Sequence, residues 1–380
     1  MNRWGRLFAK GGKMIDPRVT KFAEVLVNFC VKLKKEDLVL IQGTELAAPL
    51  IREVYKKATL AGAYPYTRIG IEGLDEIYFK YSSNDQLKFI SPLRKMEIEK
   101  VDALISIQST YNSRTLSAID PAKQAIVQKA GAGLMKKYME RAAKGELNWV
   151  GCLYPTLSAA QDANMSLSNY EDFVFAACKV DKKDPIAEWK KVSIYNARLI
   201  KYLKTKKIIR IVAKDTDLTY NIGGRNWINC DGSNNFPDGE VFTAPVENSA
   251  NGHIRFTYPA IYSGREVDDV TVEFKDGKAV SAKAAKGEAF LNAMLDVDKG
   301  ARFLGEVAIG TNFGIAQHTK NILFDEKIGG TIHMAFGESY PESGGKNHSG
   351  IHWDMICELR QGGEMYADGE LFFKNGKFLK

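Results

Sequence analysis

The sequence lacks long apolar runs, paired cysteines and the glycine motifs of nucleotide-binding loops. No apolar stretch reaches the roughly 18 residues that a transmembrane helix needs, so no membrane span is expected. The five cysteines form no C-x-x-C pair, which argues against cysteine-ligated zinc and indicates reduced thiols in a cytoplasmic protein. Neither G-x-G-x-x-G nor G-x-x-x-x-G-K-[ST] occurs, so the sequence gives nucleotide binding little support.

Acidic side chains are missing from the first thirteen residues, where Arg3, Arg6, Lys10 and Lys13 supply +4 of the formal net charge of +7. We interpret residues 1–13 as a disordered extension or the product of an upstream start codon before Met14. Elsewhere the sequence has no clustered basic stripe and no aromatic RNA-binding motif, so nucleic acid is not an expected partner.

The first half of the chain alternates apolar strand patterns with helical patterns. Short strands are expected at Leu38–Ile41, Tyr64–Ile69, Ala103–Ile107 and Trp149–Leu153, with helices between them. Strands separated by helices predict a mostly parallel sheet. The run Ala-Gly-Ala-Gly at 130–133 lies inside a helical pattern, which is not where a phosphate-binding loop would be.

The second half is rich in short strands separated by Gly, Asn and Asp. Asp276-Gly277 and Asn375-Gly376 are typical hairpin turns. The predicted fold class is therefore α/β, with a mostly parallel α/β domain at 14–206 followed by a β-rich α+β domain at 207–380.

Histidine and acidic residues gather in the β-rich half, where four of the five histidines fall between residues 318 and 352. Side chains on a strand alternate between faces, so His352 and Asp354 should project together. His333 lies opposite the apolar face of its strand, and Glu306 is a half-buried carboxylate among small residues. Such a carboxylate needs a partner, which a divalent cation would supply.

A structural salt-bridge network is the alternative explanation of this cluster, because a single histidine on a strand is often a hydrogen-bonded core residue. His318 and His348 lie in polar loops and are expected at the surface. Glu240 follows a rigid Pro-Asp-Gly turn at the start of a strand, where functional residues are common, although an isolated acid there is usually solvated.

Several phrases resemble the M29 family of metallo-aminopeptidases, the group of aminopeptidase T, AmpS and PepS, along nearly the whole chain from Met14. They are Asn235–Thr243 (NFPDGEVFT), Glu306–Asn312 (EVAIGTN), Leu323–Glu326 (LFDE), Ile332–Gly337 (IHMAFG) and His352–Asp354 (HWD). Tyr154–Thr156 and Tyr170–Val174 support the resemblance.

The resemblance implies a metal-dependent aminopeptidase that removes N-terminal amino acids from peptides with a water molecule activated by two metal ions. The implied metal ligands are Glu240, Glu306, Glu326, His333, His352 and Asp354, with Glu306 as the bridging carboxylate. Glu326 is implied as a ligand or the general base, and Tyr340 as the active-site tyrosine that stabilises the oxyanion. The spacer between Glu326 and His333 is longer than in some members, which leaves these two roles of Glu326 open.

The resemblance further implies two divalent metal ions per chain, with zinc, cobalt or manganese all compatible with the mixed oxygen and nitrogen ligands. It implies peptide substrates with a free N-terminus and a homodimer. Two other hypotheses are a different two-metal amidohydrolase and a non-catalytic ligand-binding α/β protein.

Overall fold

The computed structural model describes residues 16–380, so the interpretation of residues 1–13 lies outside the described residues. The chain divides into two compact units: the first extends to Ile186 and the second begins at Ala187, except that Asp162–Asn164 groups with the second. The boundary between the two units therefore lies near the start of helix α9 (Pro185–Leu203). The boundary predicted from the sequence, near residue 206, lies just after the end of this helix.

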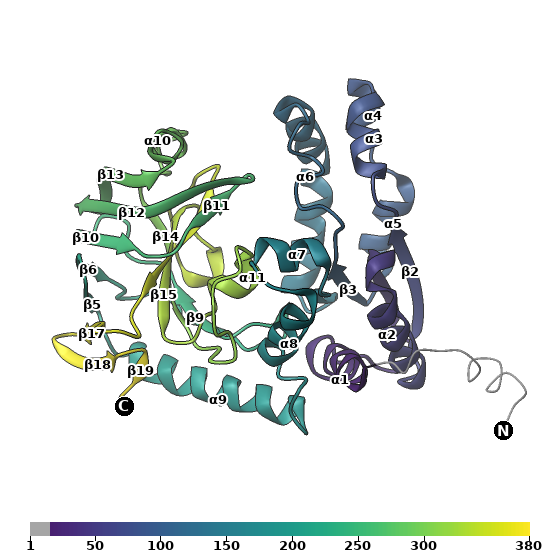
Figure 1. Ribbon diagram of the computed structural model, residues 1–380, viewed down its shortest axis with the longest axis horizontal. Helices are drawn as coiled ribbons and strands as arrows, with labels where there is room; N and C mark the ends of the chain where they lie inside the picture. Colours follow the sequence, from purple (N-terminus) through teal and green to yellow (C-terminus); the bar gives the residue numbers. More distant parts are fainter. Residues whose placement is uncertain (1–15) are drawn as a thin grey trace, which may run out of the picture. The chain divides into compact units, whose positions relative to one another are not determined.

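The first unit contains a parallel sheet with the strand order β2-β1-β3-β4, which confirms the predicted α/β character. Figure 1 shows the helices of this unit beside its strands. Its strands are β1 (Leu38–Thr44), β2 (Tyr64–Gly70), β3 (Ala103–Gln108) and β4 (Asn148–Leu153). Its helices are α1 (Pro17–Val25), α2 (Ala48–Leu60), α3 (Leu74–Tyr81), α4 (Asn84–Lys88), α5 (Pro92–Lys100), α6 (Pro121–Ala143), α7 (Leu157–Asp162) and α8 (Leu167–Ala177), with a π-helical turn at Leu26–Cys30 and a 3₁₀ turn at Glu45–Ala47.

Helix α6 contains the glycine run that the sequence placed in a helix. Asp120 caps this helix by accepting a hydrogen bond from the backbone N–H of Ala122, and Pro121 occupies the first turn, where a missing N–H costs nothing. Gly131 and Gly133 lie in the helix interior, so they form no loop around a phosphate.

The second unit is built mainly from antiparallel strands. Its larger sheet has the order β11-β12-β10-β6-β5-β17-β18-β19, with β13 paired to β12, and the smaller one has the order β16-β15-β14-β9-β7. The bounds are β5 (Ile208–Ala213), β6 (Thr216–Asn221), β7 (Ile228–Cys230), β8 (Asn235–Phe236), β9 (Glu240–Thr243), β10 (Asn251–Phe256), β11 (Ala260–Tyr262), β12 (Arg265–Lys275), β13 (Lys278–Lys286), β14 (Leu304–Gly310), β15 (Thr331–Gly337), β16 (His352–Glu358), β17 (Glu364–Ala367), β18 (Glu370–Lys374) and β19 (Lys377–Phe378), with helices α10 (Glu288–Leu295) and α11 (Ile322–Asp325) and a 3₁₀ turn at Pro341–Ser343.

The two sheets of this unit share one hydrophobic core. Side chains from the larger sheet, such as Ile211 and Val272, belong to the same buried cluster as Val307, Met334 and Met355 from the smaller sheet. Sheets that pack face to face leave one outer face each. The outer face of the smaller sheet is consequently available for polar side chains.

Both predicted hairpin turns are present. Asp276 and Gly277 between β12 and β13 have φ of 49° and 83°, and Asn375 and Gly376 between β18 and β19 have φ of 49° and 74°. Positive φ at both central residues is what a two-residue turn needs to match the twist of its strands.

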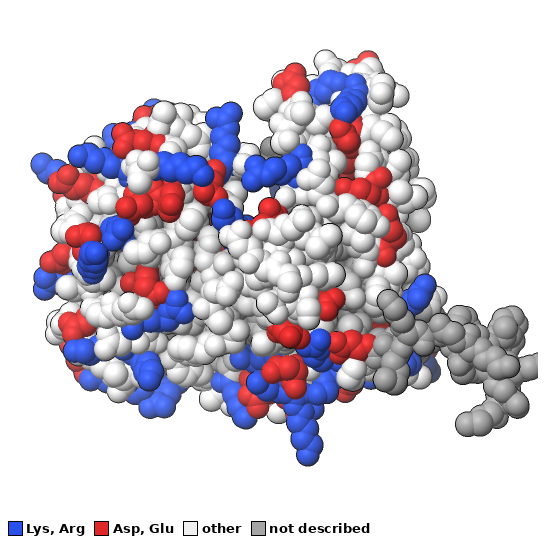
Figure 2. All heavy atoms as spheres, in the orientation of Figure 1, with Lys and Arg blue, Asp and Glu red and all other residues white. Residues whose placement is uncertain are grey.

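On the face drawn in Figure 2, Lys and Arg side chains are interspersed with Asp and Glu side chains. Among the described residues, no helix combines the length and the apolar character that crossing a membrane would require.

Candidate metal centre

The candidate metal centre lies on the outer face of the smaller sheet. In β14, β15 and β16, alternate residues point into the shared core, including Val307, Met334 and Met355. The residues between them therefore point outward by the two-residue period of a strand. These outward residues include Glu306, His333, His352 and Asp354, and Glu240 starts the neighbouring strand β9.

Small residues separate the candidate ligands and leave room between them. Ala335 on β15 is aligned with Glu306 on one side and Asp354 on the other. Gly310 is aligned with Glu240. A larger side chain at Ala335 would occupy the space that the two flanking carboxylates face.

A glycine fixes the entry into β9. Gly239 has φ of 117°, and a Cβ at this position would come 2.8 Å from the Cβ of Asn312. Only glycine adopts this conformation at low cost and fits this contact. The Pro-Asp-Gly sequence thus positions Glu240 at the first residue of its strand.

Glu306 is at the centre of the cluster because its two carboxylate oxygens face different histidines. Its Oε1 lies 3.2 Å from His333 Nε2, and its Oε2 lies 3.5 Å from His352 Nε2. His352 Nε2 is also 3.6 Å from Asp354 Oδ1, and His333 Nε2 is 3.5 Å from Glu240 Oε2. One carboxylate therefore stands between two groups of possible ligands.

The main chain fixes the orientation of both imidazole rings. The Nδ1–H of His333 donates to the carbonyl oxygen of Glu326 at 2.8 Å, and that of His352 donates to the carbonyl oxygen of Glu338 at 2.8 Å. Each Nε2 therefore faces the carboxylates of the cluster. Metal-bound histidines are generally oriented by such a hydrogen bond on the other ring nitrogen.

Glu240 supplies a direct test of whether a cation fits here. Its Oε2 is buried and, among the described residues, has no hydrogen-bond partner. Two ligands that are each about 2.1 Å from one ion lie roughly 3 to 3.5 Å apart, and the separations around His333 and His352 are close to this range. The oxygen and nitrogen donors thus fit divalent metal ions.

The pKa shifts show how these buried groups depend on one another. Burial raises the pKa of Glu240 to about 8. Burial opposes protonation of His333, but the carboxylates of Glu306 and Glu240 outweigh it and raise its pKa to about 10. Positive charge at this point is therefore strongly favoured.

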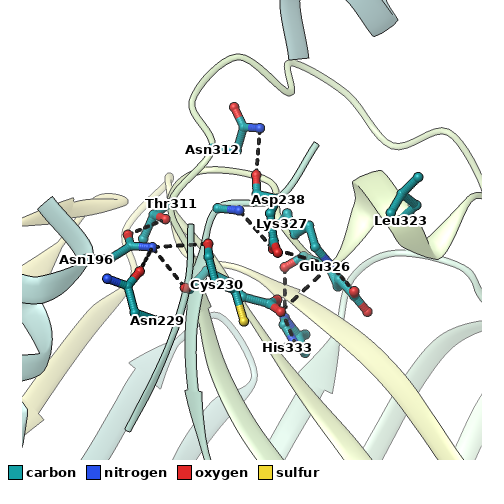
Figure 3. Close-up of polar contacts among 12 residues, drawn as sticks. Asn196, Asn229, Cys230, Asp238, Thr311, Asn312, Leu323, Glu326, Lys327 and His333 are labelled. Atoms are coloured by element: carbon teal, nitrogen blue, oxygen red, sulfur yellow. Dashed lines mark hydrogen bonds and ion pairs between the residues drawn. The ribbon is translucent and has the colours of Figure 1, made fainter. Parts of the chain in front are cut away.

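Lys327 brings a second positive charge to the cluster, and the sequence analysis did not assign it a role. Its side chain is fully buried, and its ammonium contacts the Glu326 carboxylate and lies 3.8 Å from Glu240 Oε1 and 4.0 Å from Asp238 Oδ1 (Figure 3). A buried charge of this kind requires partners of opposite sign.

Asp238 and Cys230 were also missed. They form a group with Glu240 whose possible ligand atoms all lie within 4.8 Å of one another. Burial raises the pKa of the Cys230 thiol, and a thiol ligates a metal only when it is deprotonated. Lys327 already offsets the negative charge of Asp238 and Glu240. The group of Cys230, Asp238 and Glu240 is therefore a weaker candidate for a metal site than the cluster around Glu306.

Tyr340 lies beside the cluster, and its ring centroid is 4.9 Å from that of His352 and 5.6 Å from that of Phe242. Burial and the surrounding carboxylates, Glu306 first among them, raise its pKa. The phenol therefore stays protonated and can donate a hydrogen bond.

The structure brings together the residues that the sequence analysis proposed as ligands: Glu240, Glu306, His333, His352 and Asp354 form the cluster, and Glu326 adjoins it through Lys327. His348 is exposed, as expected. The expectation for His318 is wrong, because its ring stacks on Tyr258 and its Nε2 lies 3.1 Å from Asp325 Oδ2.

No local signal marks Lys327 as buried. It stands between the acidic pair Asp325-Glu326 and the uncharged segment Ile-Gly-Gly-Thr-Ile, and composition alone normally places lysine at the surface.

Comparison with known proteins places this arrangement in a family. The profile of the family described as "Thermophilic metalloprotease (M29)" matches residues 15–378. Aminopeptidase 2 of Geobacillus stearothermophilus is 28% identical over 90% of this chain and 86% of its own length. Aminopeptidase T of Thermus thermophilus is 26% identical over 92% of this chain and 95% of its own.

A solved structure has the same fold. Wild-type AmpT from Thermus thermophilus superposes with a TM-score of 0.83, covering 96% of this chain and 99% of that one, at 24% sequence identity. The mixed architecture of a parallel α/β unit and antiparallel sheets is therefore shared over almost the whole length of both chains.

Proposed function

This chain belongs to the M29 family of thermophilic metalloproteases, and from that premise we propose that it removes N-terminal amino acids from peptides with the help of two divalent metal ions. Membership of the family makes it a metal-dependent peptide hydrolase. The relatives named above are aminopeptidases, which supports a substrate with a free N-terminus.

The observation that carries the two-ion proposal is the position of Glu306 between two histidines. Its separate oxygens face His333 and His352 at 3.2 and 3.5 Å. We assign one ion to Glu240, His333 and Glu306, and the other to His352, Asp354 and Glu306. The mixed donors suit zinc, cobalt or manganese.

Bound divalent ions would lower the pKa of water and polarise the peptide carbonyl. The remaining chemistry belongs to the side chains. Glu306 is shared by both ligand groups, and the main-chain carbonyls of Glu326 and Glu338 keep each Nε2 free for coordination.

Glu326 is proposed to carry the proton. Its side chain is 16% exposed, and its carboxylate contacts the buried ammonium of Lys327 beside the ligand cluster. The same carboxylate would return the proton to the leaving amine. Its two possible roles, ligand and general base, predict different outcomes for Glu326→Gln: loss of bound metal in the first case, and retained metal with low kcat in the second.

Tyr340 is proposed to stabilise the tetrahedral oxyanion. Its phenol is protonated, and its ring packs on His352 beside the ligand cluster. A donor of this kind contributes when charge develops on the carbonyl oxygen.

A homodimer and a cytoplasmic location complete the proposal. The described cysteines are free, and most of them are buried, which suits a reducing compartment. Mass determination in solution tests the dimer.

The test is hydrolysis of leucine p-nitroanilide by the purified protein before chelation, after chelation and after addition of zinc, cobalt or manganese. We expect chelation to abolish activity, metal to restore it and Glu306→Gln to lower kcat by at least about 100-fold. Glu273→Gln, on the exposed part of β12, is the matched control. Stoichiometric metal binding with no hydrolysis of any aminoacyl substrate would instead favour another two-metal amidohydrolase, and no metal binding would favour a ligand-binding protein.

A further inference from the structure

A cavity of about 230 Å³ adjoins the candidate metal centre on the side of Asp354. Its walls come from three places in the second unit: strand β16, the segment from Pro259 to Ile261, and the segment that leads into helix α11. None of its residues belongs to the proposed ligands except Asp354.

Apolar side chains form much of the wall. Ile356 is two residues after Asp354 on β16, so both side chains lie on the outward face of that strand. Ile261 and Ile322 contribute from the other two walls. These two isoleucines are 39% and 50% exposed, so an apolar group that entered the cavity would remove apolar surface from water.

The polar groups in the wall already have partners. Asp325 accepts hydrogen bonds from the backbone N–H and the hydroxyl of Thr319 and lies 3.1 Å from His318 Nε2. The ammonium of Lys320 donates to Glu266 at 2.7 Å. A charged ligand would have to displace one of these contacts, whereas an apolar ligand would disturb none of them.

The cavity also lies next to the residues that are proposed to hold the metal ions and to carry the proton. One wall contains Asp354, and another wall, helix α11, ends at Asp325 immediately before Glu326. A peptide whose first carbonyl lies at the ligand cluster would have the side chain of its N-terminal residue within reach of this space.

The volume sets a lower size for a ligand that fills the cavity. One water molecule occupies about 10 to 15 Å³ of such a space, so the cavity of about 230 Å³ admits a side chain of several carbon atoms. An alanine side chain would leave most of it empty.

We propose that this cavity is the specificity pocket for the N-terminal side chain and that it selects large apolar residues such as leucine and phenylalanine. This inference rests on the proposed aminopeptidase function and names its substrate class. Ile322 and Ile261 are the side chains that determine the preference.

The first experiment measures kcat/KM for leucine, alanine and lysine p-nitroanilides with the metal-loaded protein. We expect leucine to exceed both alanine and lysine by about 10-fold or more, because each buried methylene of a substrate contributes appreciably in an apolar pocket. Ile322→Asp should lower the leucine-to-alanine ratio by about 10-fold and raise lysine relative to leucine. Ile208→Asp, at an isoleucine that is 40% exposed on β5, is the matched control and should change neither ratio.

A second readout separates this inference from the proposed function. Calorimetric binding of L-leucine and L-alanine to the metal-loaded protein needs no turnover, and we expect leucine to bind about 10-fold more tightly in the native protein and not in Ile322→Asp. If no substrate is hydrolysed but this binding difference is found, the proposed function fails and the pocket stands. Equal binding of the two amino acids, or a leucine preference that Ile322→Asp leaves unchanged, would overturn the pocket.

Discussion

The ammonium of Lys327 lies 3.8 Å from Glu240 Oε1, with both side chains buried, while Glu240 Oε2 faces His333 at 3.5 Å. The two oxygens of one carboxylate therefore serve different neighbours. Oε1 is paired with the ammonium of Lys327, and Oε2 faces the ligand cluster.

Lys327→Met should destabilise the metal-free protein by about 3 kcal/mol or more, because it leaves Asp238, Glu240 and Glu326 without their buried counter-charge. Bound metal should reduce this loss, since it supplies positive charge to the same carboxylates. Urea unfolding with chelator and with excess zinc measures both values. Lys191→Met removes an exposed ion pair with Glu188 on α9 and should cost under about 1 kcal/mol; an equal loss with and without zinc would contradict this explanation of Lys327.

Ala335→Val should weaken metal binding without removing a ligand. Ala335 is buried between Glu306 and Asp354 in the strand register, so two added methyl groups enter the space those carboxylates face. We expect zinc affinity to fall about 10-fold or more and stability to fall by about 1 to 3 kcal/mol. Competition with a chelating dye measures the affinity.

Ala367→Val, at a buried alanine of β17, is the control for the valine substitution itself. It should bring a similar loss of stability with unchanged zinc affinity. If both variants bind zinc as the native protein does, the space beside Ala335 has no part in the metal site.

Asn196 connects helix α9 to the strand that carries Glu240. Its side-chain amide donates to the carbonyl oxygen of Glu240 at 3.0 Å and accepts from the hydroxyl of Thr311 at 2.7 Å (Figure 3). Asn196→Leu leaves these buried groups with fewer partners, so we expect a loss of about 2 to 4 kcal/mol in the free energy of unfolding.

Thermal or urea unfolding checks the loss at Asn196, with Asn169→Leu on an exposed part of α8 as the comparison. That control should change stability by less than about 0.5 kcal/mol. A change of the same small size at Asn196 would show that the contacts to Glu240 and Thr311 do not contribute.

Glu266 should make the free energy of unfolding decrease as the pH falls below about 4.5. Its hydrogen bonds with Lys286 and Lys320 lower its pKa to about 2, below the value of 4.5 expected in the unfolded chain. A carboxylate whose pKa is lowered by folding contributes stability that is complete above the unfolded pKa and is lost as the pH falls toward the folded one. Glu266→Gln should therefore be less stable than the native protein at pH 6, and this gap should be smaller at pH 3.

The gap is measured from urea midpoints at the two pH values, with Glu273→Gln on the same strand as the control. A gap that is constant, or that widens as the pH falls, would have the wrong sign for a lowered pKa at Glu266.

Local pattern was sufficient to predict the elements that carry the ligands. The alternation around Glu306, His333 and His352 predicts which side chains share a face, because a shift of one residue would put every ligand into the core. Strands β14, β15 and β16 are confirmed by the structure, and the M29 resemblance by the match over residues 15–378. The roles assigned to the individual ligands stay predictions.

Other features depend on tertiary contacts that no local pattern contains. Lys327 is buried because three carboxylates from separate segments surround it. His318 is covered because Tyr258, far away in sequence, stacks on its ring. The cavity beside Asp354 likewise combines three separate segments, so neither its size nor its apolar character could be predicted from sequence.

The hydrogen bonds that fix His333 and His352 go to main-chain carbonyl oxygens of Glu326 and Glu338. These oxygens belong to the backbone, so a substitution of either glutamate side chain leaves the acceptor of the imidazole hydrogen bond in place. In variants of Glu326 or Glu338 the backbone oxygen that orients the histidine is therefore still present, and the change under test is the loss of the carboxylate.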